Sequence, residues 1–235
     1  MSSSRLHYLP APVLLYLLLG GLILLLLALL QVGLLNRAYR TLGLEPRVAM
    51  LVLLGSLIGS YVNIPLARLP EQRVVARTFV DIFGVPYYVP EVADWPGTIL
   101  AVNVGGAVIP VLLSIYLVLH NRIFISAAIA TAVVAVIVHR LATPDPGVGI
   151  TVPLIAPALI AALTAVILSR VNGPALAYVG GSLGVLIGAD LANLGSLQTL
   201  GASVASIGGA GTFDGVFLAG VVAVLLAGIG ARRRA

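Results

Sequence analysis

A small number of charged residues divides the chain into long uncharged blocks, and this pattern constrains the fold more than any other feature. The blocks are 6–36, 48–67, 95–121, 123–139, 146–169, 171–189 and 215–231. A helix needs roughly 20 residues to cross the hydrocarbon core of a bilayer, and most of the blocks reach that length. Because 60% of the 235 residues are hydrophobic and only 9% are charged, a water-soluble domain could not bury so much apolar surface. The first partner of this chain is therefore the lipid bilayer.

We predict an all-α fold, namely a polytopic transmembrane helix bundle of about seven spans in a single integral membrane domain, residues 1–235. Every backbone amide in lipid must be paired within the protein, which favours helices throughout. Glycine and proline nevertheless predict broken or re-entrant segments. These interruptions are Asn63-Ile64-Pro65, NVGGAVIP at 103–110, Pro153 and Pro157, and the glycine-rich connection at 193–213.

The one sizeable polar segment, residues 67–97, predicts an extramembrane loop. It carries four acids and three arginines, and its Tyr87, Tyr88 and Trp95 are amphipathic rings of the kind that settle at headgroup depth. The apolar spacing in RVVARTFVDIF predicts an interfacial helix, whereas VPYYVP predicts an extended chain.

The arginines predict the orientation of the chain in a cell (inner) membrane that it crosses several times. All thirteen basic residues are arginine. With seven spans, five of them fall on one face and eight on the other, and the positive-inside rule then places the C-terminus in the cytoplasm. The first group is Arg5, Arg68, Arg73, Arg77 and Arg140, and the second is Arg37, Arg40, Arg47, Arg122, Arg170 and Arg232 to Arg234.

Several classes of chemistry are excluded or disfavoured by what the chain contains. Without cysteine there are no disulfides and no thiolate nucleophiles or metal ligands. His7, His120 and His139 lie near span ends and form no H-E-x-x-H motif, so we expect neither a metal nor a cofactor. Because the arginines lie between spans, we expect no nucleic-acid partner. The oligomeric state is left open.

The sixth block combines a packing stripe with an acid. Gly180, Gly184 and Gly188 recur every four residues, which predicts close approach of a neighbouring helix. On a regular helix Asp190 points away from that stripe. An ionisable residue within a span is a candidate functional group.

The second acid near a span is Asp214, in the stretch SIGGAGTFDGVF. One interpretation is structural, with Thr212 capping the last helix and Asp214 stabilised by the helix dipole. The other makes Asp190 and Asp214 catalytic partners that share one proton, so that one carboxyl group activates water while the other protonates a leaving group. Asp145, between two prolines, is expected to accept a turn hydrogen bond.

The same residues allow a transport function. Small transporters bind ions and solutes at broken helices through carboxylates, freed carbonyls and amides. The substrate would be a membrane peptide for a hydrolase, or an ion or small solute for a proton-coupled carrier. A non-catalytic scaffold is the third possibility. The candidate binding residues are Asn63, Asn103, Asn193, Gly209, Gly211 and Thr212.

Two family resemblances extend these expectations. Five stretches of the chain resemble a family of uncharacterised polytopic membrane proteins of bacteria and archaea. They are GSYVNIPL, NVGGAVIP, PDPGVGI, IGADLANL and SIGGAGTFDGVFLAG. More distantly, Asp190 in GADL and Asp214 after a glycine run resemble the two aspartates of presenilin-type and prepilin-peptidase-type intramembrane proteases. That second resemblance implies aspartyl protease activity, although Thr212 and Phe213 separate Gly211 from Asp214, where the protease signature has glycine and aspartate adjacent.

Overall fold

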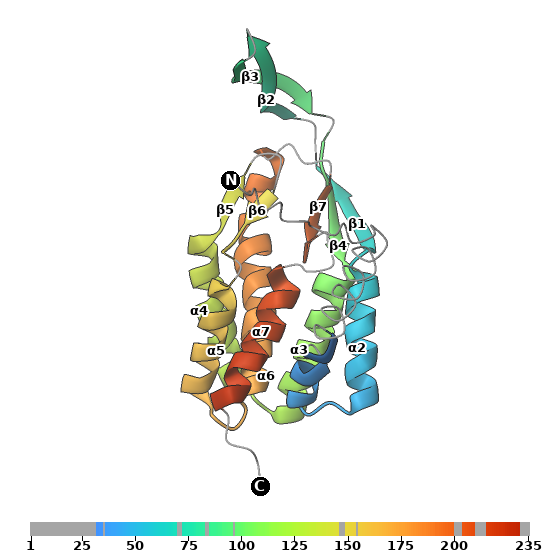
Figure 1. Ribbon diagram of the computed structural model, residues 1–235, viewed down its shortest axis with the longest axis vertical. Helices are drawn as coiled ribbons and strands as arrows, with labels where there is room; N and C mark the ends of the chain where they lie inside the picture. Colours follow the sequence, from blue (N-terminus) through green and yellow to red (C-terminus); the bar gives the residue numbers. More distant parts are fainter. Residues whose placement is uncertain are drawn as a thin grey trace, which may run out of the picture.

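Figure 1 shows the computed structural model of the protein, which describes residues 32–34, 36–69, 72–82, 85–95, 97–145, 149–153, 155–199, 204–209 and 215–230. The predicted first span, 6–36, lies almost entirely outside these residues. So do Gly211, Thr212 and Asp214.

The body of the molecule is a bundle of helices that lie side by side, as predicted (Figure 1). Within the described residues, three continuous helical stretches are long and apolar enough to cross a membrane: Val104–Asn121, Phe124–Leu141 and Gly173–Ser196. Other helices are apolar but shorter. The α-helices are α2 (Pro46–Gly59), α3 (Ile109–Asn121), α4 (Phe124–Leu141), α5 (Ala156–Leu168), α6 (Gly173–Val185) and α7 (Gly215–Gly230).

Helix α6 forms the centre of the bundle, in contact with α3, α4, α5 and α7. Its glycine stripe packs against α4, as the spacing predicts. A Cβ atom on Gly180 would lie 3.2 Å from the Cβ of Ala130, and one on Gly184 would lie 2.6 Å from the Cβ of Val134. Because neither glycine has a side chain, the two helix backbones approach closely.

A three-stranded sheet stands at one end of the bundle (Figure 1), and the predicted all-helical pattern does not include it. Its order is β1-β4-β7, with β1 (Asn63–Arg68) antiparallel and β7 (Val204–Ile207) parallel to the central β4 (Ile99–Asn103). The predicted break at Asn63 is confirmed, because α2 ends at Gly59 and β1 begins four residues later. Proline at position 65 favours extended backbone just before it, and pairing with β4 then satisfies those backbone groups.

Residues 72–82 and 85–95 are the two strands of a β-hairpin that extends beyond the sheet (Figure 1). Strand β2 (Gln72–Ile82) pairs with β3 (Val85–Trp95) in one continuous antiparallel register. The interfacial helix predicted over RVVARTFVDIF is therefore wrong, whereas the extended chain predicted for VPYYVP is confirmed. The apolar residues of β2 fit helical spacing, but several of them are β-branched, which favours a strand. Strand β3 has the same length as β2 and pairs with it along its whole length.

The helices that meet the sheet are irregular at that end. A π-helix, η1 (Val104–Val108), joins β4 to α3, and a second one, η2 (Leu186–Asp190), continues α6. The 3-10 helix η3 (Leu191–Thr199) follows η2. For residues 193–213 the sequence predicts a turn and a re-entrant piece. The described residues of this range instead form η3 and β7. A further short hairpin consists of β5 (Thr143–Asp145) and β6 (Gly149–Thr151).

Candidate functional site

The side chain of Asn103 connects the end of the sheet to the end of the helix bundle through hydrogen bonds. It is the last residue of β4 and is 1% exposed. Its Nδ2 group donates to the Ser60 carbonyl oxygen (2.7 Å) and to Asn63 Oδ1 (3.0 Å). Its Oδ1 atom accepts a hydrogen bond from the Gly106 N–H (2.7 Å), which begins the π-helix η1. Both hydrogens of the amide are therefore used within the protein.

Asn63 extends this network to the third strand. The Ser206 hydroxyl of β7 donates to Asn63 Oδ1 at 2.6 Å. One asparagine oxygen thus joins β1, β4 and β7, although Ser206 lies 143 residues from Asn63 in sequence. We call the side chains of Asn63, Asn103 and Ser206 the junction network. Its first effect is structural, because it fixes where three interrupted segments meet.

Asp190 is held by the turn that follows β7. The Gly208 N–H donates to Asp190 Oδ2 at 2.7 Å. Gly208 adopts a φ of +85°, a conformation that glycine reaches without steric cost. A Cβ atom there would lie 2.6 Å from the Ala107 N atom of η1, so the turn packs directly on the π-helix. The carboxylate and the junction network therefore share the segment 206–208.

The position of Asp190 also depends on the π-helix η2. In a π-helix the hydrogen bonds run from i to i+5, so the 100° rotation per residue assumed for a regular helix does not apply across residues 186–190. Asp190 nevertheless contacts the β7 turn, whereas Gly188 of the glycine stripe packs on Ala135 of α4, in keeping with the predicted separation of Asp190 from the stripe. Asp190 is half-buried there.

Asn193 hydrogen-bonds to backbone carbonyls near the end of its own helix and not to the junction network. Its Nδ2 group donates to the carbonyl oxygens of Gly188 (3.0 Å) and Ala189 (2.9 Å). These carbonyls lie at the irregular end of the α6 helix, where regular backbone partners are lost. The Asn193 amide therefore stabilises the helix break instead of facing the junction network.

The structure thus brings Asn63, Asn103, Asp190 and Gly209 to one junction. Gly209 donates its N–H to the Ser206 carbonyl oxygen (3.1 Å) and has a φ of +77°. Ser206 and Gly208 are parts of this junction that the sequence analysis did not single out. The adjacent glycines at 208 and 209 were the available signal for the turn, but nothing local shows which distant carboxylate the turn would bind.

Within the described ranges, the junction contains no arrangement suited to a metal ion. No group of three histidine, aspartate or glutamate side chains lies close enough together there to hold one. Asp190 also forms no ion pair with any described residue, and its Oδ1 atom accepts no hydrogen bond from them. It is a half-buried carboxylate with one backbone donor.

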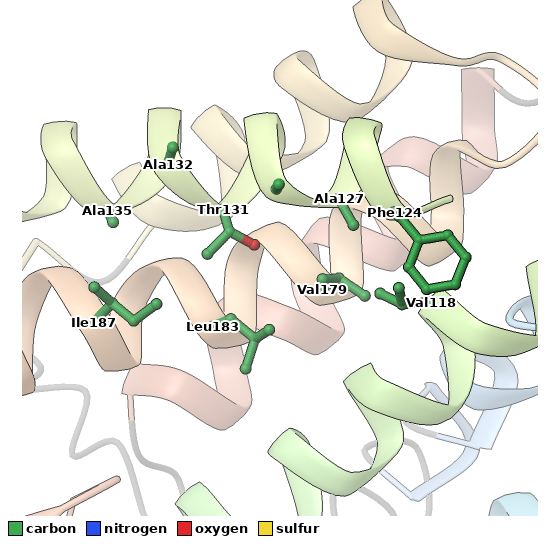
Figure 2. A pocket seen from close by; sticks show the side chains of 10 residues that line it. Val118, Phe124, Ala127, Thr131, Ala132, Ala135, Val179, Leu183 and Ile187 are labelled. Carbon is green, nitrogen blue, oxygen red and sulfur yellow. The ribbon is translucent and has the colours of Figure 1, made fainter. Parts of the chain in front are cut away.

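A groove of about 480 Å³ lies elsewhere, between α3, α4 and α6 (Figure 2). Apolar side chains line it, and Thr131 is the one hydroxyl among its lining residues. It contains no titratable group, so it offers no chemistry comparable to that of the junction. Its small α4 side chains, among them Ala128 and Ala132, explain its concave shape.

These features define a helical membrane protein whose interrupted helices meet a small sheet at one polar junction. The chain belongs to the family described as protein of unknown function (DUF1614), whose model matches residues 57–226. That range contains the junction network, Asp190 and every helix from α3 to α6. No curated protein and no solved structure matches the chain. The resemblance to an uncharacterised membrane-protein family is confirmed, and the resemblance to aspartyl proteases has no support.

Proposed function

We propose that the protein is a small ion transporter that carries protons, with Asp190 as the group that binds the proton. The observation that carries this proposal is a half-buried carboxylate at a helix break, held by the Gly208 N–H and without an ion-pair partner among the described residues. Transporters use such breaks because an interrupted helix exposes polar groups inside a bundle without unpairing the rest of the helix.

A proton suits this site better than a metal ion. The one described hydrogen bond to Asp190 comes from an N–H donor, and the described residues contain no group of three histidine, aspartate or glutamate side chains that could hold a metal ion. A carboxyl group in apolar surroundings loses its charge most easily by binding a proton. One oxygen can stay with Gly208 while the other gains and releases the proton.

The topology supports an orientation with the junction on the outer side of the membrane. The helix ends that carry Arg47, Arg122 and Arg170 all lie at the end of the bundle opposite the sheet (Figure 1). The positive-inside rule places that end in the cytoplasm, together with the C-terminus. Protons would therefore reach Asp190 from the sheet side. The membrane concerned would be the cell (inner) membrane.

The test is proton flux into liposomes that contain the purified protein, driven by an imposed pH gradient and read with an internal pH dye. Wild-type protein should acidify the liposomes faster than empty controls, and Asp190→Asn should lose that flux. Asparagine is a matched control for structure, because its Oδ1 atom can still accept from Gly208. Full flux in a folded Asp190→Asn protein would refute the proposal.

A diaspartyl hydrolase is the second candidate, and one observation favours it. Helix α7 begins at Gly215, immediately after Asp214 in sequence, and contacts η1, the π-helix on which Gly208 packs. The hydrolase would require both Asp190 and Asp214, whereas the transporter requires Asp190. Cleavage of a membrane peptide that disappears in both Asp190→Asn and Asp214→Asn would favour the hydrolase. A protein that keeps its function in cells with both substitutions would instead be a scaffold.

A further inference from the structure

Several polar atoms are buried inside the bundle, below the junction, with no hydrogen-bond partner among the described residues. Tyr39, Ser56, Ser114 and Ser182 are at most 1% exposed. Leaving such a group dry and unpaired is destabilising, because it has lost its bonds to water. The unpaired atoms are Asn36 Oδ1, Tyr39 Oη, Ser56 Oγ, Ser114 Oγ and Ser182 Oγ.

Three of these hydroxyls and a fourth, that of Tyr178, form a chain of neighbours in the order Ser56, Tyr39, Tyr178, Ser182. The Tyr39 and Tyr178 rings lie 6.2 Å apart between centroids, at 55° to each other. Ser56 of α2 neighbours the Tyr39 hydroxyl, and Ser182 neighbours Tyr178 one turn along α6. The Ser182 hydroxyl also lies against Gly220 of α7, which has no side chain to cover it. We call Tyr39, Ser56, Tyr178 and Ser182 the hydroxyl cluster.

The chemistry of the hydroxyl cluster favours water over an ion. Each hydroxyl can both donate and accept, and a buried water needs two to four such partners. The cluster contains no carboxylate, so a cation placed among its side chains would lack a compensating charge. Bridging water would satisfy the hydroxyls of Tyr39, Ser56 and Ser182, which have no hydrogen-bond partner among the described residues.

The hydroxyl cluster continues into the junction network. The carbonyl oxygen of Ser56 accepts from the Ser60 hydroxyl at 2.7 Å, and the carbonyl oxygen of Ser60 accepts from Asn103. The backbone of Ser56 also lies in contact with Gly105 of η1, next to the residues on which Gly208 packs. The hydroxyl cluster therefore lies next to the junction network, which shares the segment 206–208 with Asp190.

We propose that the hydroxyl cluster binds internal water, and that this hydrated cluster is the inner part of the path that protons follow from Asp190. The first half of the proposal stands on the buried hydroxyls alone. The second half rests on the proposed transport function. A proton can pass along water and hydroxyl groups by exchange of hydrogen bonds, so no side chain in the cluster needs to change its charge permanently.

X-ray radiolytic labelling tests the first half, because hydroxyl radicals made from an internal water oxidise the side chains beside it. In full-length protein in detergent, Tyr39 and Tyr178 should be oxidised well above fully buried Leu117, each rate being normalised to that of the unfolded protein. Ser56→Ala and Ser182→Ala should each lower this labelling several-fold. Tyrosines as protected as Leu117 would overturn the water site.

Proton flux tests the second half. Tyr39→Phe keeps the ring and removes one hydroxyl, so flux should fall several-fold while Tyr61→Phe, at an exposed tyrosine, leaves it unchanged. Normal flux in Tyr39→Phe would remove the cluster from the path even if water is present. Failure of the transport proposal is separately visible, because Asp190→Asn would then keep its flux whatever the labelling of the tyrosines shows.

Discussion

Gly208 is the residue on which the geometry around Asp190 depends most. It needs a positive φ, and a Cβ atom would meet the backbone of Ala107 at 2.6 Å. We predict that Gly208→Ala destabilises the protein by roughly 2–4 kcal/mol, from backbone strain and overpacking together. Thermal unfolding in detergent would measure this loss.

Gly195 provides the matched control for that substitution. Apart from its own chain neighbours and helix backbone, no described residue places an atom within 4 Å of the Cβ position at Gly195, and its φ is not in the left-handed region. Gly195→Ala should therefore leave the midpoint of unfolding close to that of the wild type. Equal effects of the two substitutions would mean that the packing of the β7 turn on η1 is not as described.

The glycines of α6 that face α4 determine how closely these two helices approach. We predict that Gly184→Leu destabilises the bundle by about 1–3 kcal/mol, because the new side chain would overlap Val134. Unfolding of the variant in detergent would measure the effect. Val134→Ala in the same chain should restore part of the loss, whereas an unchanged loss would place the clash elsewhere.

Elements that depend on local sequence were the ones that could be predicted. The glycine stripe of α6 and the helix break before Pro65 follow from spacing and from backbone chemistry. Strand β2 was missed because its apolar residues fit both a helix and a strand, and only pairing with β3 decides between them. The contacts among Asn63, Asn103 and Ser206 also join residues far apart in sequence. The sequence therefore predicts polar residues at helix breaks, but it does not predict which of these breaks lie next to each other.

For the whole molecule, the distribution of arginine predicts which end faces the cytoplasm. Because the chain has no cysteine, single cysteines can report this directly. Thr78→Cys in the hairpin should react in intact cells with a maleimide that cannot cross the inner membrane, and Val171→Cys, in the turn between α5 and α6, should react only after lysis. The reverse pattern would invert the orientation and place the junction on the cytoplasmic side.

In the proposed mechanism Asp190, held at the junction by the Gly208 N–H, gains and loses the transported proton. Infrared spectroscopy of the purified protein during a pH titration tests this most directly, since a protonated carboxyl group has its own carbonyl stretching band. The account predicts a reversible band, typical of a carboxyl group shielded from water, that is present in the wild type and absent in Asp190→Asn. Identical spectra from the two folded proteins at every pH would contradict it.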